Sequence, residues 1–305
     1  MRPQRLVPEH NYINRPLQRA KALCRTTRRT WYFPETMQRW KLILTYDGTP
    51  FHGWQIQPGL PTVQGLLASS LQHITGETVL PQGSGRTDTG VHALAQVASM
   101  DLAAPIPPAN LLRALNRALP PAIRVLSADH AAPDFHARHS AAGKTYEYRI
   151  FPRNPMLEAS IEQARPAADR ICAPFLAPYV WDCPWPMSLD LAQEAASHVV
   201  GVHDFTSFAA SDPDLAARTS DEPRTNVRTI LHSSFAMVDG LLVYRVRGTG
   251  FLHHMVRNLV GTFVDVAAGR TPPNAIPAIL DARNRSAAGP TAPARGLFLV
   301  SVEYL

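Results

Sequence analysis

Segments with strand-type spacing and segments with helix-type spacing alternate along this chain from about residue 40 to residue 305. Leu42, Leu44 and Tyr46 alternate with other residues, as in a half-buried strand. Apolar residues then recur at helical spacing at Val63, Leu66, Leu67, Leu71 and Ile74. This order of short elements predicts an α+β fold, with helices packed on one side of a mostly antiparallel sheet.

The strand and helix patterns occur in two successive halves, residues 41–143 and residues 144–305. The first half adds a second helix, for which Asn110 is a suitable N-cap. The second half opens on the alternating Tyr146, Tyr148 and Ile150, and a long helix is predicted to start near Phe251. A Pro-rich stretch at about residues 152–186 is expected to be irregular, with one short helix.

The positive charge of the chain is concentrated at its N-terminus. Residues 1–40 hold nine Lys and Arg against two Asp and Glu, whereas the whole chain carries a net charge of +6. We expect this segment to be a disordered basic extension, which could contact RNA phosphates or serve as an organellar presequence, although it contains no serine. Alternatively, it is a gene-start error in which Met37 is the initiator. The remaining residues carry almost no net charge, so any contact with RNA phosphates must come from local arginines. The candidates are Arg224, Arg228, Arg245 and Arg247.

Cysteine usage and hydropathy exclude several classes of protein. The three cysteines, Cys24, Cys172 and Cys183, are scattered and form no CxxC pair, which argues against a disulfide framework or a zinc knuckle. No apolar run approaches the roughly 18 residues that a membrane-spanning helix needs. We therefore expect a cytoplasmic protein with no membrane partner.

The run from Gly85 to Ala93, GRTDTGVHA, is the strongest candidate for a functional site. It places Asp88 on a glycine-flanked turn two residues after Arg86. Glycines let the backbone take positive φ and let a planar substrate approach closely. A carboxylate beside a guanidinium stays ionised and is suited to act as a nucleophile. The alternative is an ordinary surface turn, in which the aspartate caps its own backbone.

Several blocks of sequence resemble one known family. GRTDTGVHA is similar to the signature of the tRNA pseudouridine synthase A family, and further similar blocks follow in the family's order. They are residues 42–55 (LILTYDGTPFHGWQ), 61–65 (PTVQG), 144–150 (KTYEYRI), 203–208 (HDFTSF), 251–258 (FLHHMVRN) and 296–300 (GLFLV).

The resemblance implies a fold, an activity and a set of site residues. The fold would be two RRM-like, ferredoxin-like halves that form one sheet with a central RNA-binding cleft. The enzyme would be a homodimer that isomerises uridine to pseudouridine at positions 38 to 40 of the tRNA anticodon stem-loop. Asp88 would be the nucleophile, Tyr146 would stack on the uracil, Arg257 would pair with Asp88, and Arg86 would fill the space left by the extracted base.

No cofactor and no metal are expected, because the isomerisation changes no oxidation state and releases no group. The adjacent His253 and His254 are predicted to lie on a helix, where neighbours point about 100° apart and do not easily share one ion. No HExxH or zinc-deaminase signature occurs either.

Three alternatives remain open at this stage. A non-catalytic RNA-binding protein could use the same fold, although such a protein has no need of Asp88, Tyr146 and Arg257. A nucleosidase-like hydrolase could use Asp88 on a free nucleoside, and it would release uracil. A pseudouridine synthase of another branch, acting on ribosomal RNA, is disfavoured because those branches carry a different aspartate loop.

Overall fold

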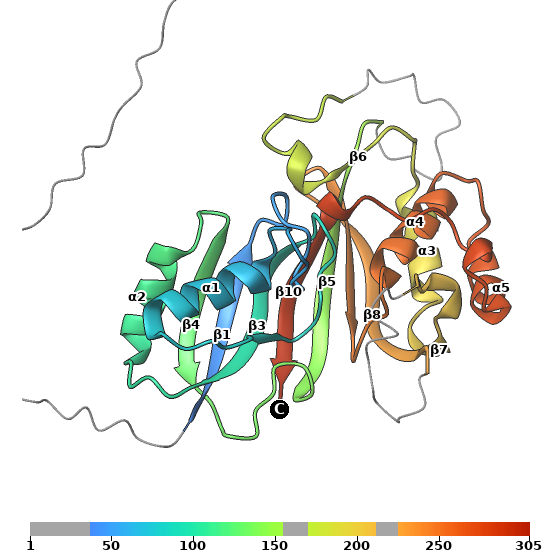
Figure 1. The fold of residues 1–305 in the computed structure, drawn as a ribbon. Helices are drawn as coiled ribbons and strands as arrows, with labels where there is room; N and C mark the ends of the chain where they lie inside the picture. The colour runs from blue at the N-terminus through green and yellow to red at the C-terminus, as the bar shows by residue number, and fades with distance from the viewer. Residues whose placement is uncertain (1–36, 155–169, 212–224) are drawn as a thin grey trace, which may run out of the picture. The chain divides into compact units, whose positions relative to one another are not determined.

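A computed structural model describes residues 37–154, 170–211 and 225–305, which form one continuous sheet with helices beside it (Figure 1). Within these residues ten strands join in the order β4-β1-β3-β10-β5-β9-β8-β7, with β2 beside β3 and β6 beside β5. Only the β10–β3 and β5–β6 pairs of the described strands are parallel, which confirms the mostly antiparallel sheet. The strands are β1 (Gln38–Tyr46), β2 (Gln82–Gly83), β3 (His92–Leu102), β4 (Ile123–His130), β5 (Ala141–Pro152), β6 (Trp181–Cys183), β7 (Gly201–Asp204), β8 (Val227–Val238), β9 (Leu241–Gly248) and β10 (Leu297–Tyr304).

Five α-helices accompany the sheet in the described part of the chain. None of them is long and apolar enough to cross a membrane. They are α1 (Val63–Thr75), α2 (Pro108–Ala118), α3 (Leu189–Ser197), α4 (Met255–Ala267) and α5 (Ala275–Ala282).

The start of α2 differs from the sequence-based expectation. Pro107 is the N-cap and the helix begins at Pro108, so the prediction that Asn110 caps it is wrong. Proline fits the first helical position because its φ is already helical and its missing N–H would have no partner there. Asn110 lies in the first turn, where its side-chain oxygen accepts a hydrogen bond from Arg113 at 2.5 Å.

The helices pack on one face of the sheet, as predicted (Figure 1). On β9 the buried Tyr244 alternates with the outward Arg245, and the Tyr244 ring contacts Phe263 of α4 at a centroid distance of 5.4 Å. The strand register carries this apolar face across the sheet, because Tyr146 lies opposite both Val246 of β9 and Leu299 of β10. These residues share one core cluster with the apolar residues of α1 and α2, so the two halves of the chain have a common core.

The last strand joins the two predicted halves. β10 comes from the end of the chain but lies between β3 and β5, and it is antiparallel to β5. The predicted boundary at residue 143 falls inside β5. β1 begins at Gln38, so the end of the predicted 1–40 extension is part of the sheet, where Trp40 is 1 % exposed. The earlier residues of that extension lie outside the described residues.

The Pro-rich stretch contains one strand that the sequence did not predict. β6 pairs in parallel with the end of β5, and a short 3₁₀ helix at Ala177–Tyr179 precedes it. Three residues are too few to give a periodic pattern, so only the neighbouring β5 identifies the strand. Residues 155–169 of this stretch are outside the described residues.

Candidate active site

Asp88 lies on the loop between β2 and β3, and the segment that follows β1 supports this loop. The backbone N–H of Trp54 donates a hydrogen bond to the Thr87 carbonyl at 3.0 Å. Gly53 has a φ of +82°, and a Cβ atom at this position would lie 2.5 Å from the same carbonyl oxygen. Glycine is therefore required there both for its backbone conformation and for the close approach of the two segments.

A buried polar network holds the loop from below. The Tyr46 and Thr87 hydroxyls are 2.8 Å apart, and the Gln96 amide donates to the Gly85 carbonyl at 3.0 Å. The Ser84 hydroxyl completes the network by donating to the Gln96 side-chain oxygen at 2.6 Å. Burial raises the pKa of Tyr46 to about 12, so its hydroxyl keeps its proton at neutral pH. This network was not predicted from the sequence, although a glutamine within an apolar strand is a signal for it.

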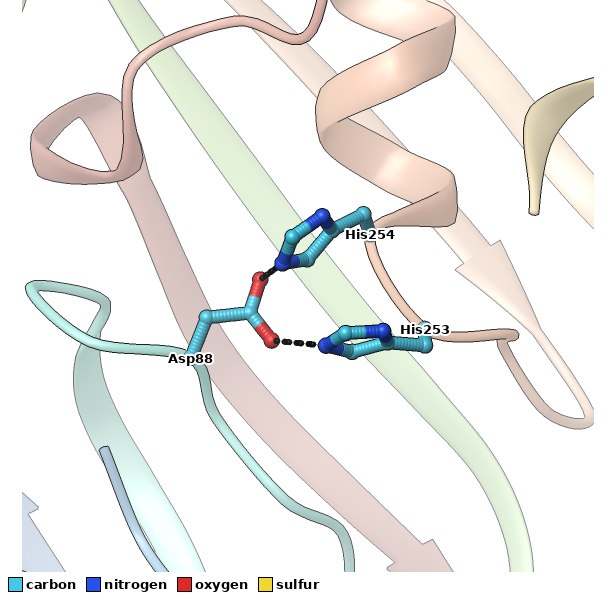
Figure 2. A group of neighbouring side chains, drawn as sticks. All are labelled: Asp88, His253 and His254. Carbon is cyan, nitrogen blue, oxygen red and sulfur yellow. Dashed lines mark ion pairs between the residues drawn. The ribbon is translucent and has the colours of Figure 1, made fainter. Parts of the chain in front are cut away.

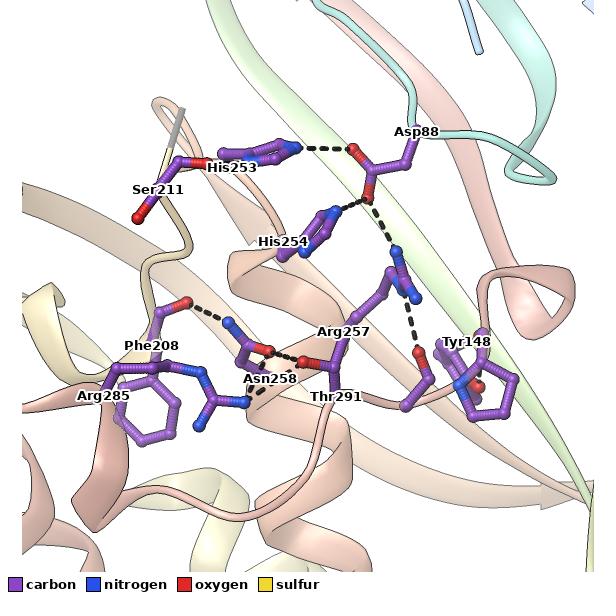
Figure 3. Close-up of polar contacts among 12 residues, drawn as sticks. Asp88, Tyr148, Phe208, Ser211, His253, His254, Arg257, Asn258, Arg285 and Thr291 are labelled. Atoms are coloured by element: carbon purple, nitrogen blue, oxygen red, sulfur yellow. Dashed lines mark hydrogen bonds and ion pairs between the residues drawn. The ribbon is translucent and has the colours of Figure 1, made fainter. Parts of the chain in front are cut away.

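Three side chains that are distant in sequence converge on the Asp88 carboxylate (Figure 2, Figure 3). Arg257 Nη1 lies 3.1 Å from Oδ2, His254 Nε2 lies 3.2 Å from Oδ2, and His253 Nε2 lies 3.5 Å from Oδ1. The Asp88 side chain is 18 % exposed and lies at the N-terminal end of α4. The partial positive charge of a helix N-terminus and the guanidinium both stabilise a carboxylate there.

Arg257 is held in place by the loop that precedes β10. Its Nε donates to the Ala292 carbonyl at 2.8 Å, which leaves Nη1 for Asp88 (Figure 3). The next residue, Asn258, is fully buried, and its amide donates to the Phe208 carbonyl at 2.8 Å. Its oxygen accepts from Thr291 at 2.7 Å, so the first turn of α4 is anchored on two sides.

The predicted position of the two histidines is wrong. The helix begins at Met255 rather than near Phe251, because His254 has a left-handed backbone with a φ of 57°. His253 and His254 therefore precede the helix, and their ring centroids are only 4.0 Å apart. The helical separation of about 100° does not apply to them, and both rings reach Asp88.

Tyr146 lies on β5 beside the aspartate loop. Its ring is buried and meets Phe251 edge-on at a centroid distance of 5.0 Å. A Cβ atom on Gly85 would be 4.0 Å from the Tyr146 hydroxyl, so this hydroxyl reaches the loop that carries Asp88. Burial raises the pKa of Tyr146, and the nearby negative charge of Asp88 adds to the shift. The tyrosine is therefore neutral at physiological pH.

Arg86 lies on the outer side of the same loop. It lines a pocket of about 120 Å³ together with Trp54, Gln64, His136 and Arg138. The Lys144 ammonium lies close by and donates a hydrogen bond to the Ser84 carbonyl at 2.6 Å. Burial lowers the pKa of Lys144 to about 8.

The arginines predicted to contact phosphate lie on different faces of the sheet. Arg245 and Arg247 point away from the Asp88 face, and they pair with Glu147 at 2.7 Å and Glu303 at 2.6 Å. Arg228 lies on the Asp88 face, where its side chain is 3.7 Å from the position of a Cβ atom on Gly250. Arg224 is outside the described residues.

A carboxylate that is held by an arginine, beside a buried tyrosine and on the helix-covered face of a shared sheet, is an arrangement typical of an enzyme active site. The family described as tRNA pseudouridine synthase matches this chain over residues 42–140 and 195–305. The chain belongs to this family of isomerases.

Curated relatives agree with the family match over most of the chain. "tRNA pseudouridine synthase A" of Solibacter usitatus is 49 % identical over 269 residues, which covers 88 % of this chain and 100 % of the relative. The protein of the same name from Moorella thermoacetica is 41 % identical, covering 87 % of this chain and 98 % of the relative. That from Rhodospirillum centenum is 42 % identical, covering 88 % of this chain and 100 % of the relative.

Proposed function

We propose that this enzyme converts uridine to pseudouridine at positions 38 to 40 of the tRNA anticodon stem-loop, with Asp88 as the nucleophile. The family match and the names of the relatives support uridine isomerisation in tRNA. The single observation that carries the choice of nucleophile is the 3.1 Å contact between the Asp88 carboxylate and Arg257. This contact orients the carboxylate beside Tyr146 in a largely buried site.

The reaction breaks the bond between the ribose and the uracil nitrogen and rejoins the same sugar carbon to carbon 5 of the base. Asp88 serves this exchange by attacking either the sugar carbon, as in retaining glycosidases, or carbon 6 of the base. In both routes the carboxylate must stay ionised and fixed in place. Arg257 fixes the carboxylate in place, since its own Nε is held by the Ala292 carbonyl at 2.8 Å.

Tyr146 and Arg86 are proposed to hold the uridine and the RNA around it. The target base must leave the helical stack to reach Asp88, and an aromatic side chain stacks on a base with about 1–3 kcal/mol. Tyr146 is suited to this role because its hydroxyl stays protonated and can relay the proton that leaves carbon 5. Arg86, which lines the polar pocket, is proposed to fill the space that the base leaves.

We further propose a cytoplasmic homodimer with a catalytic half at 41–143 and a second half at 144–305. Both halves supply the site, because Asp88 comes from the first while Tyr146 and Arg257 come from the second. The free Cys172 and Cys183 are compatible with a reducing compartment.

Tritium release from tRNA transcripts labelled at uracil carbon 5 tests the proposal, with wild type compared with Asp88→Asn. We expect release from wild type that maps to the anticodon stem-loop, and a loss of roughly 10⁴-fold or more in the variant, the scale seen when a covalent nucleophile is removed. Asp129→Asn, at an exposed position on β4, is the matched control and should keep full activity.

The same assay separates the alternatives. Tight tRNA binding without tritium release would indicate a non-catalytic RNA-binding protein. Free uracil in the supernatant would indicate a hydrolase. Release that persists in a folded Asp88→Asn protein would exclude Asp88 as the nucleophile.

A further inference from the structure

The protonation of His253 follows from its two neighbours. Its Nδ1 lies 2.9 Å from the Ser211 carbonyl oxygen, which can only accept a hydrogen bond (Figure 3). Nδ1 therefore carries a proton, and in the neutral ring the lone pair is on Nε2. In that neutral tautomer the lone pair faces Asp88 Oδ1 at 3.5 Å, and this contact between two acceptors becomes favourable when either a proton or a metal ion lies between them.

His254 brings a second imidazole nitrogen to the same carboxylate. Its Nε2 lies 3.2 Å from Asp88 Oδ2, and one ligand atom from each of the three residues lies within 4.8 Å of the other two (Figure 2). A tetrahedral zinc ion has bonds of about 2.0–2.1 Å, which places its ligand atoms roughly 3.3 Å apart. The two nitrogen-to-oxygen distances, 3.2 Å to Oδ2 and 3.5 Å to Oδ1, are close to that spacing but end on different oxygens of Asp88, so small side-chain rotations are needed to bring all three ligand atoms onto one ion.

The types of the three ligand atoms and their surroundings also fit a zinc-like ion. Two imidazoles and one carboxylate are typical ligands of a zinc site that keeps a fourth position open. A histidine that binds a metal usually donates its other ring N–H to a carbonyl or carboxylate, as His253 does to Ser211. The side chains of Asp88, His254 and His253 are 18 %, 28 % and 29 % exposed, so an ion can enter from solvent.

We propose that Asp88, His253 and His254 bind one divalent ion of the zinc class, and that this ion inhibits the enzyme. The bound ion occupies the carboxylate that the reaction uses and blocks the approach of a uridine. Binding follows from the geometry alone, whereas inhibition rests on the proposed role of Asp88. The neighbouring Arg257 repels a cation, so the binding is reversible and weaker than at a structural zinc site.

A titration of the full-length, tag-free protein with Co²⁺, followed by visible absorption and by displacement with Zn²⁺, tests the binding. We expect one equivalent of ion, and affinities at least about tenfold lower in His253→Gln and in His254→Gln. His139→Gln is the matched control, because His139 lies in another close imidazole pair, 4.3 Å from His136. This control should keep the wild-type affinity.

The tritium-release assay, with Zn²⁺ added in the presence of Mg²⁺, tests the inhibition. We expect Zn²⁺ to inhibit at the concentration at which it binds, and a chelator to restore activity. Mg²⁺ should not compete, because it prefers octahedral oxygen ligands. Absence of stoichiometric binding, or binding that both glutamine variants retain, would overturn the site. Binding without inhibition would overturn the inhibitory role, and Asp88→Asn in the absence of metal tests the nucleophile separately.

Discussion

At the scale of single residues, neighbours rather than residue type decide the chemistry. Asp88 could have been the cap of a surface turn, but Arg257 and two imidazoles contact its carboxylate. Lys144 differs from an ordinary surface lysine because it is largely enclosed beside the aspartate loop and donates to the Ser84 carbonyl. The resulting change in the pKa of Lys144 can be measured through the pH dependence of stability.

Burial lowers the pKa of Lys144 from 10.5 to about 8. Between these values the unfolded chain holds a proton that the folded protein has released, so this group makes the free energy of unfolding rise with pH. Lys144→Met should remove that rise, and the stability of wild type relative to the variant should therefore increase from about pH 8 upward. Urea unfolding at several pH values between about 7 and about 10 measures it. Lys41→Met, on the opposite face of the sheet, should leave the increase of unfolding free energy with pH unchanged. If both variants lost this increase equally, Lys144 would not be its source.

At the scale of elements, the aspartate loop depends on a neighbouring segment that carries no catalytic group. The turn after β1 brings Gly53 against the Thr87 carbonyl, one residue before Asp88. The start of α4 has a comparable role, since the left-handed His254 directs two rings and Arg257 to one carboxylate. Both elements act through backbone conformation.

Two glycines in this region offer a matched test. Gly53 and Gly59 both have positive φ, +82° and +73°, but only Gly53 lies against another segment. Alanine at either position should cost about 1–2 kcal/mol of stability for the backbone conformation. Gly53→Ala should cost about 1–3 kcal/mol more through the clash and should also lower activity, because the loop must shift. Urea unfolding and tritium release check this, and equal effects at both positions would refute the role of the close contact.

At the scale of the whole sheet, its two faces carry different groups. The helices and Asp88 occupy one face, and Arg228 borders it. Arg245 and Arg247 occupy the other face and pair with glutamates. If Asp88 is the nucleophile, as proposed, a tRNA that delivers a uridine to it is expected to approach the face of Arg228.

Salt dependence of tRNA binding distinguishes the two faces. Each phosphate contact releases counterions, so the affinity of wild type should fall steeply as salt rises. Arg228→Gln should reduce the slope of log affinity against log salt by about one. Arg245→Gln should leave the slope unchanged, because its guanidinium already pairs with Glu147 on the far face. A wild-type affinity that does not change with salt would contradict this orientation of the tRNA. So would a slope that is reduced by Arg245→Gln and not by Arg228→Gln.

Local patterns in the sequence were sufficient for the fold class, for the family and for the loop that carries Asp88. Apolar spacing reports which side of an element is buried, and Thr62 marks the start of α1 by accepting a hydrogen bond from the Gly65 N–H. The same patterns failed at the cap of α2, at the three-residue β6 and at the start of α4. These depend on a proline, on a partner strand and on one left-handed residue respectively.

The sequence by itself determined the fold class, the family and the glycine-flanked aspartate, because each depends on patterns of residues close together in the chain. Only the tertiary structure decided that β10 lies between β3 and β5, and that Asp88 meets Arg257, 169 residues away, together with two histidines. The physical reason is that these contacts arise when distant segments bury a shared apolar face, and periodicity along the chain carries no record of which segments will meet.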